Sequence, residues 1–256
     1  MLSRTHISAF VGLTILVWLI VLWIEGKPVL SLSFVRPFGT VVGLIAGISI
    51  VFNKWAWAWP CFQGWFIKRP DLRGTWQVLL KSEWINPDTG KGIDPIVGYI
   101  VIRQTLMHIS VRQMTKESKS HSVSSGITKE ADEISRLSVV YRNEPDINLQ
   151  GERSDIHYGA FWLEAMGNSR QDSDGKTNSA LSKFEQFKHF LMLPFRYQGP
   201  SKLEGHYWTD RKTRGSMKLT GRVRSYLESY QCAHEHFASS NDESVTGKAV
   251  DDATGD

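Results

Sequence analysis

The chain has 256 residues and a formal net charge of +4 at pH 7, a length that allows one globular domain plus a small membrane part. Its two cysteines, Cys61 and Cys232, lie in unrelated segments, so the composition excludes a disulfide-stapled secreted scaffold and favours a reducing compartment. Residues 241–256 hold five acidic residues and one lysine, so their charge of −4 leaves +8 on residues 1–240. A basic body of this kind suits anionic partners such as lipid headgroups, phosphates or nucleic acid.

Two apolar runs open the chain and predict a helical hairpin in a membrane. They span about residues 7–24 and 37–54, each near the length at which a membrane helix is the default interpretation. A cleaved signal peptide is the alternative for the first run, but no small-x-small cleavage site follows it. Basic residues are more frequent after the second run than in the loop between the runs, which predicts that both termini are cytoplasmic. With both apolar runs, residues 1–60 form the predicted membrane part.

The second run carries Gly39, Gly43 and Gly47, a spacing that puts all three on one face of a helix. That face predicts close packing, either of the second helix on the first or between helices of different chains, and the two alternatives are weighted equally. An aromatic and then a basic segment follow, the residue types that prefer a membrane boundary and anionic headgroups. These residues are Trp55, Trp57, Trp59, Trp65, Lys68, Arg69 and Arg73.

From Asp71 onward, apolar residues alternate with polar ones, which is the period-two pattern of half-buried antiparallel strands. We therefore predict a membrane α-helical hairpin followed by an all-β domain over residues 61–224, a small antiparallel eight-stranded β-barrel. A sandwich is the alternative. Glycines inside the predicted strands fit sharp curvature and favour the barrel.

Residues 167–201 interrupt the strand pattern. Their first part is polar, and residues 181–193 carry apolar side chains near helical spacing before a proline. We expect this helix to plug one end of the barrel, and a lid or a contact surface is the alternative. Residues 225–256 are predicted to form a disordered acidic tail.

No catalytic motif and no recognisable metal spacing stands out, so we predict that the chain is not an enzyme. Ser154, Asp155 and His157 are close in sequence, but neighbours along a strand point to opposite faces, so a catalytic arrangement is not expected. What stands out instead is a clustering of hydroxyl, aromatic and cationic side chains at strand ends.

The sharpest of these clusters is residues 209–213, TDRKT, which predict a tight turn between two strands. The turn presents two cations and two hydroxyls beside Tyr207 and Trp208. Phosphates bind charge-assisted donors and bases stack on aromatic faces, so a nucleotide-like ligand fits this composition. The alternative is a solvated hairpin tip whose cations face its own Asp210.

Several segments, in order along the chain, resemble those of a known family. They are RPF (36–38), Phe66 with KRPDLRGTW (68–76), IRQT (102–105), TKESKS (115–120), YRNEP (141–145), SDIHYGA (154–160) and GHYWTDRKTRG (205–215). With them the chain resembles the two-transmembrane, β-strand-rich effectors that accompany cyclic-nucleotide synthases (CD-NTases) in bacterial cyclic-oligonucleotide antiphage signalling (CBASS). The insertion at 167–201 looks longer than that family's usual connection.

The resemblance implies a function. In such effectors the barrel binds a cyclic dinucleotide from the partner synthase, the protein assembles into homo-oligomers, and the helices disrupt the lipid bilayer. It implies a multi-pass inner-membrane protein with a cytoplasmic barrel, no cofactor besides the activating ligand, and no DNA or RNA polymer as partner. A membrane-anchored hydrolase and a lipocalin-like carrier are the alternatives. The expected ligand-binding residues are Arg103, Ser118, Ser120, Tyr141, Asn143, His157, Tyr207, Thr209, Arg211, Lys212 and Thr213, with Gly39, Gly43 and Gly47 in membrane assembly.

Overall fold

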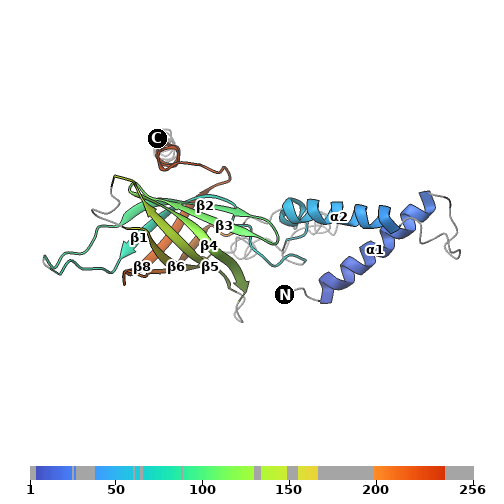
Figure 1. Ribbon diagram of the computed structural model, residues 1–256, viewed down its shortest axis with the longest axis horizontal. Coiled ribbons are helices and arrows are strands. Elements are labelled where there is room, and N and C mark those ends of the chain that lie inside the picture. Colours follow the sequence, from blue (N-terminus) through green and yellow to red (C-terminus); the bar gives the residue numbers. More distant parts are fainter. Residues whose placement is uncertain are drawn as a thin grey trace, which may run out of the picture. The chain divides into compact units, whose positions relative to one another are not determined.

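Figure 1 shows the computed structural model, whose described residues include two long helices and eight strands. It describes residues 4–24, 26, 38–59, 61–63, 66–87, 89–129, 134–148, 155–166 and 199–239. The chain divides into two compact units, one of which contains the two long helices and the other the strands.

Helix α1 (Arg4–Ile24) and helix α2 (Phe38–Lys54) lie where the apolar runs predict them. They pack on each other through Val17 and Val21 of α1 and Val41 of α2, which are buried. Many other apolar side chains on both helices are exposed. Among the described residues, no helix combines the length and the apolarity that a bilayer crossing requires. The positions of the helices are confirmed, and their crossing of a membrane stays a prediction.

The glycine face of α2 does not mediate the contact with α1. Among the described residues, a Cβ atom added at Gly39, Gly43 or Gly47 would meet nothing within 4 Å, whereas α1 contacts the side of α2 that carries Val41 and Ile45. Of the two predicted uses of the glycines, packing of α2 on α1 is therefore not seen in this structure.

The aromatic segment after α2 does not form a uniform exposed belt. Trp57, in the short 3-10 helix η2 (Ala56–Ala58), is fully buried, whereas Trp55 and Trp59 are exposed. Trp65 lies outside the described residues.

The eight strands form one closed antiparallel barrel in which each strand pairs with its neighbours in sequence (Figure 1). A ladder from Thr75↔Val223 to Ser82↔Gly215 joins the first strand to the last and closes the sheet. The predicted eight-stranded barrel is therefore confirmed, and the sandwich alternative is wrong. The strands are β1 (Gly74–Ser82), β2 (Ile96–Gln104), β3 (Ile109–Met114), β4 (Ser118–Lys129), β5 (Ser135–Pro145), β6 (His157–Met166), β7 (Lys202–Thr209) and β8 (Arg214–Val223).

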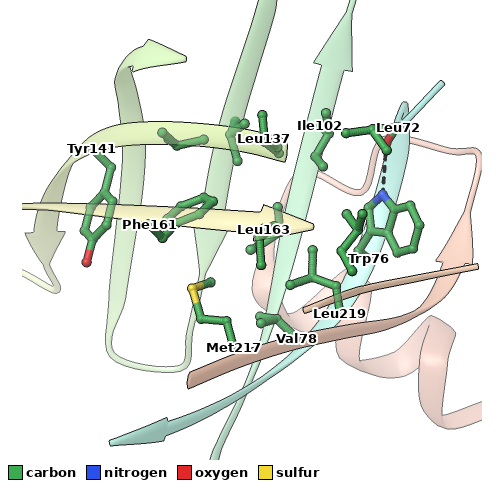
Figure 2. Close-up of a cluster of buried hydrophobic side chains, with 14 of the residues drawn as sticks. Leu72, Trp76, Val78, Ile102, Leu137, Tyr141, Phe161, Leu163, Met217 and Leu219 are labelled. Carbon is green, nitrogen blue, oxygen red and sulfur yellow. Dashed lines mark hydrogen bonds between the residues drawn. The ribbon is translucent and has the colours of Figure 1, made fainter. Parts of the chain in front are cut away.

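The barrel interior is apolar over most of its length. Alternate positions face inward, as in β5, where Leu137, Val139 and Tyr141 are buried and their neighbours are not. Figure 2 shows the resulting cluster, with the Nε1 of Trp76 donating to the Leu72 carbonyl oxygen (2.9 Å) and Tyr141 at the opposite side. Burying each large apolar side chain contributes roughly 1.5–3 kcal/mol, so this cluster is the main source of the barrel's stability.

At the end of the barrel where β1 begins and β8 ends, Asp71 connects separate parts of the chain. Its buried carboxylate accepts hydrogen bonds from Arg73 Nε (2.9 Å), Arg222 Nη2 (3.2 Å) and Arg224 Nη1 (3.1 Å). Burial alone would raise the pKa of Asp71, but the hydrogen bond from Arg73 and the charges of Arg73 and Arg222 outweigh burial and lower it. The ionised carboxylate therefore ties the segment before β1 to the end of β8.

Residues 230–239 form a helix that packs on the outer face of β2. Ala233 and Phe237 are buried against Tyr99 and Val101, and the rings of Tyr99 and Phe237 stack with centroids 5.4 Å apart. The predicted disorder from residue 225 onward does not hold for this helix. The physical reason is that β2 is apolar on both faces, so its outward face is covered by the helix. Residues 240–256 and the predicted helix at 181–193 lie outside the described residues.

Candidate ligand-binding site

Four polar side chains form a row inside the barrel where β5 ends and β6 begins, which we call the polar end. In the strand register Gln113 pairs with Ser120, Ser120 with Asn143, and Asn143 with His157. Directly paired residues point to the same face of a sheet. Ser120, Asn143 and His157 are only 5–7% exposed, so the interior changes here from apolar to polar without becoming open to water.

The row is held by specific hydrogen bonds. The Oγ of Ser120 donates to the Oδ1 of Asn143 (2.7 Å). The Nδ1 of His157 lies 3.0 Å from the carbonyl oxygen of Asp155, and its Nε2 lies 3.5 Å from the Nη2 of Arg211. A carbonyl only accepts and a guanidinium only donates, so Nδ1 carries the proton and Nε2 is the acceptor. His157 therefore links the polar row to the next cluster.

That next cluster is the turn between β7 and β8. The hydroxyls of Thr209 and Thr213 lie 2.7 Å apart, and the Thr209 amide donates to the Thr213 carbonyl oxygen (2.9 Å). Lys212 has φ 61°, a left-handed conformation that is uncommon for a residue with a side chain. The Asp210 carboxylate accepts a hydrogen bond from the Tyr158 amide (3.0 Å), which anchors the turn to β6. These hydrogen bonds hold the turn in a defined conformation. Its two cations, Arg211 and Lys212, therefore lie at the polar end.

Two tyrosines lie between the apolar cluster and the polar row. Tyr141 is across from Gly159 and Tyr207 from Gly215 in the register, and a Cβ on either glycine would collide with the facing ring. The glycines thus make room for both rings inside the barrel. Burial raises the pKa of Tyr141 to about 12; Tyr207 adds to the rise and Arg211 opposes it. The Tyr141 hydroxyl is protonated at neutral pH, and Figure 2 shows this residue at the edge of the apolar cluster beside Phe161.

The structure brings together the predicted ligand-binding residues of β4 to β8 at the polar end. Ser118 is among them, but its hydroxyl lies 3.0 Å from that of Thr115 and helps to close the β3–β4 turn. The residues at this end are Ser118, Ser120, Tyr141, Asn143, His157, Tyr207, Thr209, Arg211, Lys212 and Thr213.

Arg103 does not lie with this group. It is exposed on the outer face of β2, with its guanidinium over the Tyr226 ring (5.2 Å) and 3.7 Å from the carboxylate of Glu228. The reason is strand alternation, because its neighbours Ile102 and Gln104 are buried on the inside. Arg103 therefore lies apart from the polar end, and its part in ligand binding stays a prediction.

Sequence reasoning missed Gln113, which joins the row through its register position opposite Ser120. The period-two pattern of β3 contains the information needed to find it. Ile109 and Val111 mark the inward positions of β3, and the next inward position in period two is 113.

Comparison with known proteins points to one family. No curated protein matches the chain. Residues 67–177, which include β1 to β6, match the family model described as Cap15, cyclic dinucleotide receptor domain. This match covers Ser120, Asn143 and His157 of the polar row and supports the resemblance to CBASS effectors that the sequence motifs carry.

Proposed function

We propose that the chain is a CBASS effector whose barrel binds a cyclic dinucleotide and whose helices then assemble and disrupt the bacterial inner membrane. The observation that carries the proposal is the polar end of a barrel that matches a cyclic dinucleotide receptor domain. Cationic side chains for phosphate and aromatic side chains for bases are both present there. The protein acts in this proposal as a binding switch rather than as an enzyme.

The cationic turn is the phosphate-binding part of the proposed site. Arg211 offers a planar fork of donors that matches phosphate oxygens, and Lys212 adds a second positive charge in the same turn. Tyr141 and Tyr207 supply aromatic surface and hydroxyls beside them. A carrier of apolar ligands is less favoured, because Trp76, Ile100 and Leu163 are fully buried in the barrel interior that such a ligand would need.

The helical unit is the proposed output. In a bilayer, apolar contact between helices gains little, and close backbone approach at small residues holds them together. Among the described residues, nothing lies within 4 Å of a Cβ added at the glycine face of α2, which supports the use of this face between chains. Ligand binding then favours the assembled state of a multi-pass inner-membrane protein whose barrel faces the cytoplasm, where the synthase makes its product.

The proposal is tested by two measurements on the full-length chain. Calorimetry with cyclic dinucleotides on detergent-purified protein should show binding, and cells that carry the chain should admit an impermeant dye after a partner synthase is induced. A chain without the synthase and a synthase without the chain are the controls. Absence of binding to every cyclic dinucleotide tested would remove the receptor function. Binding without dye entry would remove the membrane output or the cytoplasmic orientation.

A further inference from the structure

We infer that β3 couples the ligand site to helix α2. Ligand binding at the polar end shifts β3 against β4, and the turn between β2 and β3 passes this shift to the C-terminal end of α2. This role of β3 rests on the proposed function and adds the route by which binding in the barrel reaches the helices. β3 has six residues, fewer than any other strand that the structure describes.

The two sides of β3 are paired to different extents. Toward β2, every residue of β3 has a partner in the ladder. Toward β4, the ladder contains three residues of β3, which are Arg112, Gln113 and Met114. Gln113 pairs with Ser120, so the part of β3 that is paired on both sides adjoins the row of the polar end.

Serine hydroxyls replace the ladder over the rest of the boundary between β3 and β4, which we call the β3–β4 seam. The Val111 amide donates to the Oγ of Ser122 (3.0 Å), and the Oγ of Ser125 donates to the carbonyl oxygen of Ile109 (2.5 Å). The register of β4 against β5 shifts between the same two serines. A hydroxyl rotates to suit its partner, so β3 can shift here without leaving backbone groups unpaired.

The β2–β3 turn connects the other end of β3 to α2. Residues 105–107 belong to the unit that contains the helices. The Leu106 amide donates to the carbonyl oxygen of Asn53 (3.0 Å), and the Met107 amide donates to the Oδ1 of Asn53 (3.1 Å). Asn53 lies in the last turn of α2, where backbone carbonyls lack partners within the helix. The turn therefore caps α2, and a displacement of β3 changes this cap.

The segment after β8 makes β1, β2 and β3 one body on the outside of the barrel. The Leu227 amide donates to the Oγ1 of Thr75 in β1 (3.0 Å), and the Nη2 of Arg112 in β3 donates to the carbonyl oxygen of Glu228 (3.1 Å). The helix at 230–239 packs on β2 between these contacts in sequence. β3 therefore moves with β1 and β2, and the β3–β4 seam is where the movement occurs.

The first test locks β3 to β4. In a chain that carries Cys61→Ser and Cys232→Ser, Arg112→Cys and His121→Cys place thiols on directly paired residues, within reach of a disulfide. The full-length chain is inserted into dye-filled vesicles of phosphatidylethanolamine and phosphatidylglycerol, and cyclic di-AMP, cyclic di-GMP and cyclic di-UMP are the probes. The oxidised pair should bind the same probe as wild type but lose dye release. Dithiothreitol should restore release.

The second test breaks the cap on α2. Asn53→Leu removes the acceptor of the Met107 amide, whereas Asn53→Asp keeps a side-chain oxygen there. Asn53→Leu should bind the probe and lose dye release, and Asn53→Asp should retain both. Asn86→Leu is the matched control in the connection before β2, where the Oδ1 of Asn86 accepts from the Thr89 amide (3.3 Å), and it should release dye as wild type does.

The two tests separate the coupling from the proposed function. Dye release by the oxidised pair at the wild-type level would overturn the role of β3 and leave the receptor and membrane functions intact. Wild-type release by Asn53→Leu would overturn the role of the turn, and this variant decides the matter if the cysteine pair does not fold. A wild-type chain that binds no probe, or binds without release, would overturn the proposed function and the coupling with it.

Discussion

At the scale of single residues, Arg211 connects the parts of the polar end. Its guanidinium contacts the His157 imidazole, and its charge acts on the buried hydroxyl of Tyr141. Nearby Arg214 differs in environment, because it is exposed and its Nε pairs with the carboxylate of Glu83 (2.7 Å) on the outside of the barrel. Removing each arginine in turn therefore compares the effect on ligand affinity of a positive charge inside the proposed site with that of one outside it.

Arg211→Ala should weaken cyclic dinucleotide binding by about 1.5–3 kcal/mol, because a charge-assisted hydrogen bond to phosphate is lost. Titration calorimetry checks this, and Arg214→Ala, which removes an equal charge at the next strand end, should leave the affinity nearly unchanged. The fold should survive in both variants because Arg211 and Arg214 are exposed. Unchanged affinity in Arg211→Ala and Lys212→Ala would remove the turn from the site.

The raised pKa of the buried Tyr141 hydroxyl predicts that the barrel loses stability at alkaline pH. A tyrosine in the unfolded chain ionises near pH 10, whereas burial raises the pKa of Tyr141 to about 12. Between these values the folded barrel keeps a proton that the unfolded chain has lost. The contribution of Tyr141 is therefore complete below pH 10, and stability falls by up to about 2–3 kcal/mol as the pH approaches 12.

The check is a tyrosinate absorbance titration of wild type and Tyr141→Phe. Their difference spectrum should titrate near pH 12. A Tyr141 difference that titrates near pH 10 would contradict the buried position of this hydroxyl.

At the scale of elements, two contacts outside the apolar core complete the barrel. Asp71 joins the segment before β1 to the end of β8 through Arg222, and the helix at 230–239 covers the outer face of β2. Both contacts involve a segment that lies outside the strands. Removing either contact should lower the free energy of unfolding by a predictable amount.

Asp71→Asn should destabilise the barrel by about 3–5 kcal/mol, because it leaves the largely buried guanidinium of Arg222 without its counter-charge. Glu83→Gln breaks the exposed ion pair with Arg214 and should cost less than about 1 kcal/mol. Urea unfolding of the full chain in detergent, followed by tryptophan fluorescence, compares the two variants. Similar costs would show that the Asp71 cluster is no more important than a surface pair.

Phe237→Ala should destabilise the barrel by about 3 kcal/mol, because it empties the space that the ring fills against Tyr99. Cys232→Ala, on the exposed side of the same helix, should have little effect. Hydrogen exchange of residues 230–239 together with urea unfolding provides the measurement. Rapid exchange of this helix in wild type would contradict its docked position.

At the scale of the whole molecule, the proposed switch requires that ligand binding in one unit changes assembly through the other. The barrel holds the candidate site, and α2 holds a face of small residues that no other described residue covers. A substitution on that face should therefore separate binding from output.

Gly43→Leu should still bind ligand at its barrel but fail to admit dye after synthase induction, because the new side chain holds a neighbouring helix away. Leu44→Ile, which changes the shape of an exposed apolar side chain on the same helix without removing a glycine, is the matched control and should retain dye entry. Full dye entry in Gly43→Leu would show that the glycine face is not the assembling surface.

The amino-acid sequence by itself determined the two helices, the eight strands and the polar segments at their ends. These features follow from local patterns, since apolar runs, period-two alternation and turn residues are read over a few residues at a time. The β7–β8 turn is an example, because TDRKT between two alternating runs predicts both its position and its chemistry.

The tertiary structure decided which faces meet. In β2, apolar residues occur at both parities, so alternation does not say whether Tyr99 or Ile100 faces inward, and the wrong choice brings Arg103 into the site. The row of Gln113, Ser120, Asn143 and His157 depends on the register of four strands, and the cover on β2 depends on a helix more than 100 residues away in the chain. Register and closure are set by pairing between distant segments, and for that physical reason local periodicity does not contain them.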